Sequence, residues 1–546
     1  MLVEWNTLGL LRPEIILVAA ATTIFVGGAF AKSRAWWALF ALISYVAAGA
    51  ALASYGPPWA EGSTLSGPVT IDPLSLSLRW LAVLMGLVFT LVATRLADPE
   101  IASEYVGSLM LVATGVMLTA SANELVLLFL GLELISIPTY VLLFLGRRDR
   151  AAGEATMKYF YLSILSSALL LYGFSFLYGI GGTTLIAGTA AHPGIREAFL
   201  PPLSLGEGRG EDSESSAGDA SPRPNPLPKG EGTNPLAPLA PLAVVLILAG
   251  LGFKLAIAPL QFYAPDVYQG TTNANAGLLA VAPKIAGVAG LVRLLVVAMP
   301  SSAEFAWQLA LILSILTMTI GNICALWQSN VRRLMAYSSI AHGGYLLIGL
   351  AAAAGAISAG QPLASGGVTA MLFYVAVYAL ATMGTFAALA YLGSPRRELD
   401  GVEQLAGLSK SQPVIAGAIA VFMFSLAGIP PLAGFWGKLT LFGSAVELAT
   451  AGTPAGMSLW FTILVVIGAL NAAVAAAYYL RIVAVMYFQP AAAAPSAAGG
   501  RTAHFAALLL AVLVIAAGIL PGRLLDAAAR SEIMLQSDAP QVAATP

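Results

Sequence analysis

The chain has 546 residues, of which 58% are hydrophobic and only 10% charged, and its formal net charge is −1. Soluble domains carry about 25% charged residues, so most of this chain is expected to face lipid or protein rather than water. The balance of charge gives no sign of a nucleic-acid partner, and the single cysteine, Cys324, excludes an intramolecular disulfide framework, a thiolate zinc site and an iron–sulfur cluster.

Apolar stretches long enough to cross a membrane recur along the chain. A transmembrane helix needs about 20 mostly apolar residues, because a rise of about 1.5 Å per residue must cover about 30 Å. The sequence predicts fourteen spans, near 14–31, 36–55, 76–95, 104–121, 124–145, 157–180, 240–258, 275–298, 306–327, 333–354, 366–393, 413–429 (extended to about 449), 458–488 and 503–521. The prediction is an all-α polytopic membrane protein.

Lysine and arginine are concentrated in alternate connections between these spans. Counted from the first span, the odd-numbered connections hold Lys32 and Arg34; Arg95; Arg147, Arg148 and Arg150; Arg332 and Arg333; Arg396, Arg397 and Lys410; and Arg501. The even-numbered connections hold none, apart from one long insert. Because cytoplasmic loops concentrate these residues, both termini are predicted to lie on the periplasmic side.

The insert covers residues 200–238 and is rich in proline, glycine, serine and charge. Such a composition cannot bury a core. We interpret it as a disordered, low-complexity insertion on the outer surface. A functional binding loop is the alternative.

Two predicted spans are interrupted by proline in a matching pattern. Phe253 to Leu260 contains Pro259, and Phe424 to Leu432 contains Pro430 and Pro431. Proline in a span removes a backbone hydrogen bond and leaves carbonyls that need partners in protein or in a water-filled cavity. The predicted topology has the two segments entering from opposite sides, which is typical of inverted repeats that handle ions at the break. Simple proline kinks are the alternative.

Four ionisable residues fall inside predicted spans: Glu133, Lys254, Lys284 and Lys438. Glu133 and Lys284 each lie nine residues into a span, which places them about 13 Å deep. Such a group costs at least about 2.5–3.5 kcal/mol at the bilayer centre, so each needs a partner or a hydrated path. Burial favours the neutral form of a lysine and a nearby carboxylate favours the charged form. One acid and three lysines on separate helices therefore suit a proton relay.

Other interpretations of these residues remain open. Each charge could form a static ion pair or extend to the interface; the central depth of Glu133 and Lys284 argues against the second alternative for them, and it stays open for Lys438. His342 could belong to the relay, because its unperturbed pKa is near 6.5, or could serve packing. Lys158 and Glu154 could form an interface pair or a point of proton uptake, and for Asp266 a cap or loop contact is the default.

Several of these segments together resemble one family. The matching stretches are Gly131-Leu132-Glu133-Leu134 with Pro138-Thr139-Tyr140; Glu154-Ala155 with Lys158-Tyr159-Phe160; Gly252-Phe253-Lys254; Pro265 to Gly270; Pro283-Lys284; Met335 to His342; and Gly428-Ile429-Pro430-Pro431 through Gly437-Lys438. Over roughly residues 10–490 they resemble the antiporter-like subunit N of bacterial NADH-quinone oxidoreductase (respiratory complex I), the counterpart of mitochondrial NADH dehydrogenase subunit 2. The Asp-Val-Tyr motif followed by Pro-Lys distinguishes this subunit from the larger subunits M and L.

The resemblance implies an organisation and a set of roles. It implies fourteen helices with two inverted five-helix repeats, each holding a broken helix. The chain would then comprise N-terminal helices over 1–103, a first repeat over 104–298 containing the insert, a second repeat over 306–488, and a C-terminal helix and tail over 489–546. Glu133 and Lys254 would be the coupled pair, Lys284 the middle of the proton relay and Lys438 its exit side.

The resemblance also implies partners and location. The subunit would bind no cofactor and no metal itself, while the whole complex would carry NADH, FMN, iron–sulfur clusters and quinone. Its partners would be lipid and other membrane subunits of complex I, in the bacterial inner membrane. The alternatives are a component of a multi-subunit cation/proton antiporter, which shares the fold and the buried lysines, and a scaffold whose charges only pair.

Overall fold

The computed structural model describes residues 5–58, 64–94, 98–147, 149–189, 192–199, 236–361, 366–393, 399–450, 452–490 and 497–537. Most of the predicted insert lies outside these residues. The same is true of four arginines of the predicted basic connections, Arg95, Arg148, Arg396 and Arg397. The described residues are mostly helical, and among them a small sheet is formed by an antiparallel pair of short strands in which Leu65 lies opposite Thr70.

The N-terminal half contains α1 (Trp5–Leu10), α2 (Arg12–Gly28), α3 (Arg34–Ala53), β1 (Thr64–Ser66), β2 (Val69–Ile71), α4 (Pro73–Ala93), α5 (Ala102–Ser121), α6 (Leu125–Gly146), α7 (Arg150–Gly181), α8 (Ile195–Phe199), α9 (Ala240–Leu255), α10 (Tyr263–Gly270) and α11 (Asn273–Leu291). A π-helical segment, Val292–Ala298, continues α11, and 3-10 turns lie at Ala237–Leu239, Leu260–Phe262 and Pro300–Ser302.

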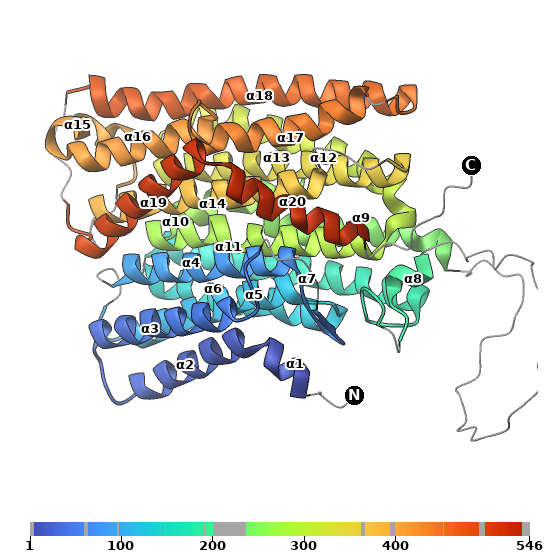
Figure 1. The fold of residues 1–546 in the computed structure, drawn as a ribbon. Coiled ribbons are helices and arrows are strands. Elements are labelled where there is room, and N and C mark those ends of the chain that lie inside the picture. Colours follow the sequence, from blue (N-terminus) through green and yellow to red (C-terminus); the bar gives the residue numbers. More distant parts are fainter. Residues whose placement is uncertain are drawn as a thin grey trace, which may run out of the picture.

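The C-terminal half contains α12 (Ala303–Leu326), α13 (Val331–Ala359), α14 (Gly367–Leu392), a 3-10 turn (Val402–Leu405), α15 (Leu408–Ser411), α16 (Pro413–Ala427), α17 (Ala433–Thr450), α18 (Ala455–Phe488), α19 (Arg501–Ile519) and α20 (Gly522–Ser537). The long helices run side by side across the molecule, from the N-terminal helices at one end to α18 at the other (Figure 1).

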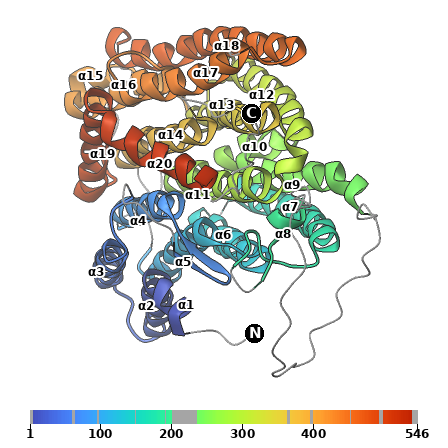
Figure 2. The ribbon, with the colours of Figure 1, turned by 45° about the vertical axis from the view of Figure 1, so that its right-hand side comes forward.

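Within the described residues, twelve helices or helix pairs are long and apolar enough to cross a membrane. The structure therefore does not confirm the predicted count of fourteen full-length spans. The remaining two predicted spans correspond to α2, which has only 17 residues, and to α16–α17, whose first half is an apolar helix of 15 residues. Helices α11, α13 and α14 form the interior, because about 94% of each apolar stretch is buried. They lie between the N-terminal helices and α16–α18 (Figure 2).

One end of the bundle, called the basic face below, carries the connections next to Lys32, Arg147, Arg333 and Lys410. These connections join α2 to α3, α6 to α7, α12 to α13 and α14 to α16, and they lie on the left in Figure 1. The N-terminus and α8 lie at the opposite end. The alternation of basic connections in the sequence thus corresponds to one end of the fold.

Two buried ion pairs hold α4 in the bundle, one to α2 and one to the π-helical segment, and the sequence did not reveal either. Arg79 on α4 forms hydrogen bonds of 2.8 and 2.5 Å to both carboxylate oxygens of Glu14 on α2. Arg293 on the π-helical segment contacts both oxygens of Asp72 at 2.6 and 2.9 Å. Asp72 also caps α4 by accepting the Ser75 N–H. A paired and hydrogen-bonded charge is the form in which a charge can be buried.

Both predicted helix breaks are present. Helix α9 ends at Leu255 and α16 at Ala427, each followed by a residue with positive φ, Ala256 (56°) and Gly428 (86°). Both helices end three or four residues before the first proline, because a proline ring clashes with the carbonyl four residues earlier and disfavours helix in the residue before it. The halves α9–α10 and α16–α17 run in opposite directions relative to the basic face (Figure 1).

The chain continues beyond the last predicted span as α20, where the sequence suggested only a tail. Glu532 near its end accepts hydrogen bonds from the backbone N–H and the hydroxyl of Thr369, at the start of α14. Burial raises the pKa of the Glu532 carboxyl. Arg523 and Asp526 are exposed while Ala528 and Ser531 are buried, so α20 packs on the bundle with one face.

Candidate functional site

Glu133 and Lys254 form the first ion pair of the site. Lys254 Nζ lies 3.9 Å from Glu133 Oε1, and the lysine side chain is 1% exposed whereas the glutamate side chain is 22% exposed. Lys254 donates a hydrogen bond of 2.5 Å to Ser136 Oγ, and the Ser167 hydroxyl donates to Glu133. The pair thus joins α6 to α9. Each of its two residues is hydrogen-bonded to a serine hydroxyl that can take part in moving a proton.

Lys254 stands in the last turn of α9, directly before the break. The last four carbonyls of a helix have no intrahelical partner and carry partial negative charge. The broken helix therefore places a negative dipole end next to this lysine at mid-span, where an uninterrupted helix would offer none.

Lys284, in the middle of α11, has hydroxyl and aromatic neighbours instead of an acid. It is 1% exposed and donates a hydrogen bond of 2.6 Å to Ser339 Oγ on α13. Its Nζ lies 5.4 Å from the centre of the Tyr378 ring, and the Tyr378 hydroxyl donates to Ser339 Oγ at 3.0 Å. Among the described residues it forms no ion pair. This site can hold an ammonium by cation–π attraction and hydrogen bonding, but the charge is not neutralised.

His342 lies on α13, three residues beyond Ser339, and is 3% exposed. Its Nδ1 lies 2.6 Å from the Tyr374 hydroxyl and its Nε2 3.0 Å from the Tyr479 hydroxyl. The centres of the His342 and Tyr378 rings are 4.8 Å apart. Tyr378 therefore contacts Lys284 on one side and His342 on the other.

Lys438, on α17, reaches back to the second break. Its Nζ donates a hydrogen bond of 2.8 Å to the Ala427 carbonyl, the last residue of α16, and lies 5.2 Å from the Tyr345 ring centre. The side chain does not extend to the interface, which was the alternative for this residue. A cavity of about 10 Å³, about the smallest that holds a water molecule, is lined by Lys438, His342, Tyr374, Tyr378 and Ser425, among others.

Gly428 lets Lys438 reach this position for two reasons. Its φ of 86° lies in the left-handed region, which residues with a side chain rarely adopt. A Cβ at this position would also lie only 2.9 Å from Lys438 Cδ. We expect Gly428→Ala to lower the stability of the protein by about 1–2 kcal/mol from backbone strain and to displace the lysine. Thermal unfolding of the purified protein measures the first effect. Gly417→Ala is the matched control, since a Cβ at Gly417 meets nothing within 4 Å, and an equal loss in both variants would contradict this explanation.

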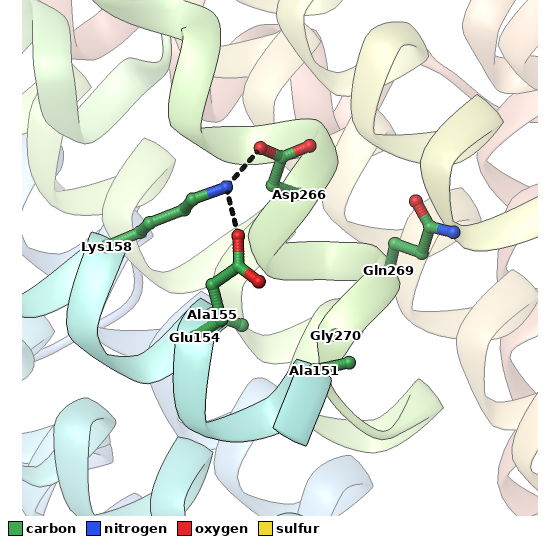
Figure 3. Close-up of a pocket in the computed structure, with 7 residues that line it drawn as sticks. All are labelled: Ala151, Glu154, Ala155, Lys158, Asp266, Gln269 and Gly270. Atoms are coloured by element: carbon green, nitrogen blue, oxygen red, sulfur yellow. Dashed lines mark hydrogen bonds and ion pairs between the residues drawn. The ribbon is translucent and has the colours of Figure 1, made fainter. Parts of the chain in front are cut away.

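Lys158 lies apart from these residues, in a pocket at the basic face. Its Nζ contacts Glu154 at 2.7 Å and Asp266 at 2.8 Å (Figure 3). Arg333 binds the other oxygen of Asp266 at 2.6 Å. The cavity of about 350 Å³ is also lined by Ala151, Gln269 and Gly270. The predicted pair with Glu154 exists, but Asp266 is an ion-pair partner on α10 rather than a loop contact.

Sequence reasoning missed the hydroxyl groups that contact the ionisable residues. They are Ser136, Ser167, Ser339, Tyr374, Tyr378 and Tyr479. One signal existed, because Tyr374 and Tyr378 are four residues apart and so share a helix face. The described residues contain no group of three or more His, Cys, Asp or Glu side chains that could hold a metal ion.

Two broken helices, each with a buried lysine beside its break and hydroxyl or carbonyl groups bound to that lysine, are the features of an antiporter-like, ion-translocating membrane subunit. The sequence profile of the family described as NADH:quinone oxidoreductase/Mrp antiporter matches residues 122–198 and 229–476. NADH-quinone oxidoreductase subunit N of Rubrobacter xylanophilus is 35% identical over 79% of this chain and 80% of its own length. The same subunit of Paramagnetospirillum magneticum is 35% identical over 80% and 81%.

Solved structures agree. A chain of respiratory complex I from Thermus thermophilus with bound aureothin is 29% identical, with a TM-score of 0.72 over 94% of this chain and 98% of that chain. A chain of the Mrp complex from a Dietzia species has a TM-score of 0.75 at 20% identity, covering 98% of this chain and 100% of that chain, and this likeness concerns the fold. The chain belongs to the subunit N family of NADH-quinone oxidoreductase.

Proposed function

We propose that this chain translocates protons along a buried line formed by Glu133, Lys254, Lys284, His342 and Lys438, as a subunit of NADH:quinone oxidoreductase. In this role it binds no redox cofactor itself. Quinone reduction elsewhere in the complex, which holds NADH, FMN and iron–sulfur clusters, changes the electrostatic surroundings of the Glu133–Lys254 pair. The lysines respond by exchanging protons with one another. Lys158 and its pocket at the basic face serve proton uptake.

The observation that carries this proposal is the surroundings of Lys284. A permanently charged lysine at this depth is costly unless an acid neutralises it, and Lys284 is bound by a hydroxyl and an aromatic face instead. A site of this kind suits a lysine that alternates between ammonium and amine, because a serine hydroxyl can accept from the first and donate to the second.

The arrangement of the chain fits the same proposal. The repeats cover 104–298 and 306–488, and each contains one of the two broken helices, which run in opposite directions. The subunit lies in the bacterial inner membrane beside other membrane subunits of complex I, with the basic face towards the cytoplasm and both termini towards the periplasm. The opposite orientation would place the arginine-rich connections outside, against the usual bias.

Replacing Lys284 with methionine tests the proposal. Methionine keeps the length and apolar contacts of the side chain but carries no proton. We expect NADH-driven proton pumping by vesicles that contain the assembled complex to fall at least about tenfold, which corresponds to about 1.4 kcal/mol or more of lost barrier lowering. Lys410→Met, at an exposed lysine of the basic face, is the control and should pump normally.

Two outcomes would replace this proposal with another function. Unchanged pumping by an assembled Lys284→Met complex would leave the scaffold role. Purification of the chain with other antiporter subunits, and without NADH dehydrogenase activity, would establish a component of a multi-subunit cation/proton antiporter.

A further inference from the structure

Both ring nitrogens of His342 are held by tyrosine hydroxyls from two different helices. Tyr374 on α14 contacts Nδ1 at 2.6 Å and Tyr479 on α18 contacts Nε2 at 3.0 Å. All three residues are buried. Since each ring nitrogen is held from a different helix that contacts α13, the imidazole cannot turn without losing both hydrogen bonds.

The chemistry of the two contacts depends on the charge of the ring. A neutral imidazole has one N–H and one lone pair, so one hydroxyl accepts from it and the other donates to it. A protonated imidazolium donates from both nitrogens, so both hydroxyls must accept. Tyr479 can take this role because its own proton can turn towards Ser338 Oγ, with which its hydroxyl is hydrogen-bonded. Tyr374 borders the cavity that His342 shares with Lys438.

The titratable and charged groups that face His342 supply no opposite charge. They are Lys284 on α11, Tyr345 on α13 itself, Tyr374 and Tyr378 on α14, Lys438 on α17 and Tyr479 on α18. Both lysines oppose a positive charge on the ring. Hydroxyl oxygens are therefore the groups that can stabilise a proton on this histidine.

We propose that Tyr374 and Tyr479 are positioning residues that enable His342 to carry a proton between Lys284 and Lys438. This step rests on the relay described above, and it moves one proton from one lysine to the other. The ammonium of one lysine gives up a proton and becomes an amine, His342 becomes an imidazolium that donates to both tyrosine oxygens, and the proton then passes to the amine of the other lysine. No electrons move, and each tyrosine keeps its own proton count.

Tyr479→Phe tests the proposal in the assembled complex, because it removes the hydroxyl and keeps the ring. A hydrogen bond to a charged group corresponds to about one pH unit or more. We expect the pH at which vesicle proton pumping is half-maximal to shift by about one unit towards acid, so that pumping at neutral pH falls about tenfold. Tyr374→Phe should act in the same direction.

The neighbouring tyrosine on α18 gives a matched control. Tyr478 is also buried, and its hydroxyl donates a 3.0 Å hydrogen bond to Asn322 rather than to His342. Tyr478→Phe should leave the pH profile in place, whereas Ser338→Ala, which removes the group that accepts the Tyr479 proton, should shift it in the same direction as Tyr479→Phe. A purely structural role for Tyr479 predicts less assembled complex with an unshifted profile.

The possible results separate this inference from the function beneath it. If Lys284→Met stops pumping while Tyr479→Phe and Tyr374→Phe both keep the wild-type pH profile, the positioning role is wrong and the relay stands. If Lys284→Met pumps normally, the relay itself is wrong. If Tyr479→Phe fails to assemble, Tyr374→Phe on the other helix decides, and an unshifted profile there overturns the proposal.

Discussion

Replacing Glu133 with glutamine is expected to reduce NADH-driven proton pumping by about tenfold or more, and to reduce the amount of assembled complex as well. The substitution leaves Lys254 buried with Ser136 as its remaining hydrogen-bond partner. Removing one member of a fully buried ion pair costs about 3–5 kcal/mol, because the other charge stays uncompensated. The loss here should be smaller, because the Glu133 side chain is 22% exposed. Pumping is measured as acidification of vesicles, and assembly by quantifying the purified complex.

The double variant Glu133→Gln/Lys254→Met separates stability from function. Neither side chain is then charged, so assembly should recover compared with Glu133→Gln alone. Pumping should not recover, since no proton can be exchanged at this position. Glu403→Gln, at an exposed position, is the matched control for a lost carboxylate. Recovery of pumping in the double variant would show that the pair is a static structural contact.

Arg293→Met should produce the largest loss of stability. The arginine side chain is 4% exposed and binds both oxygens of Asp72, which is 8% exposed and caps α4. The variant leaves a buried carboxylate without its cation, for which we expect about 3–5 kcal/mol of destabilisation. Thermal unfolding of the purified protein and the quantity of chain retained in membranes would measure it.

The exposed ion pair of Arg147 and Asp149 supplies the comparison. Its side chains are 28% and 43% exposed, and surface pairs contribute about 0–1 kcal/mol. Arg147→Met should therefore change stability little. Asp72→Asn combined with Arg293→Met should restore part of the loss, because asparagine can still cap α4. Similar destabilisation by Arg147→Met and Arg293→Met would contradict a special role for the buried pair.

The sequence predicted those parts of the fold that depend on residues close together in the chain. Apolar length located the helices to within a few residues in most cases, because a bilayer sets the same length for every span. Proline placed both breaks, and counting residues from the span ends put Glu133 and Lys284 inside helices, in α6 and α11, away from the helix ends. The distribution of arginine and lysine identified the basic face.

The missing parts depend on which helices pack together. Asp72 and Arg293 are 221 residues apart, and no local pattern pairs them. Tyr479 approaches His342 only because α18 packs beside α13, and its sequence neighbour Tyr478 has a different partner. Helix α20 was missed because its mixture of charged and small residues has too little hydrophobicity to suggest a span, while its docking depends on Thr369.

The interior position of α11 also determines how the surrounding bilayer can act on this protein. About 94% of its apolar stretch is covered by other helices, against 39% for α7 and 28% for α18. Lipid or a neighbouring subunit can therefore touch the outer helices, but neither reaches the helix that carries Lys284. Changes in lipid saturation or bilayer thickness can influence that lysine only by shifting the helices around it.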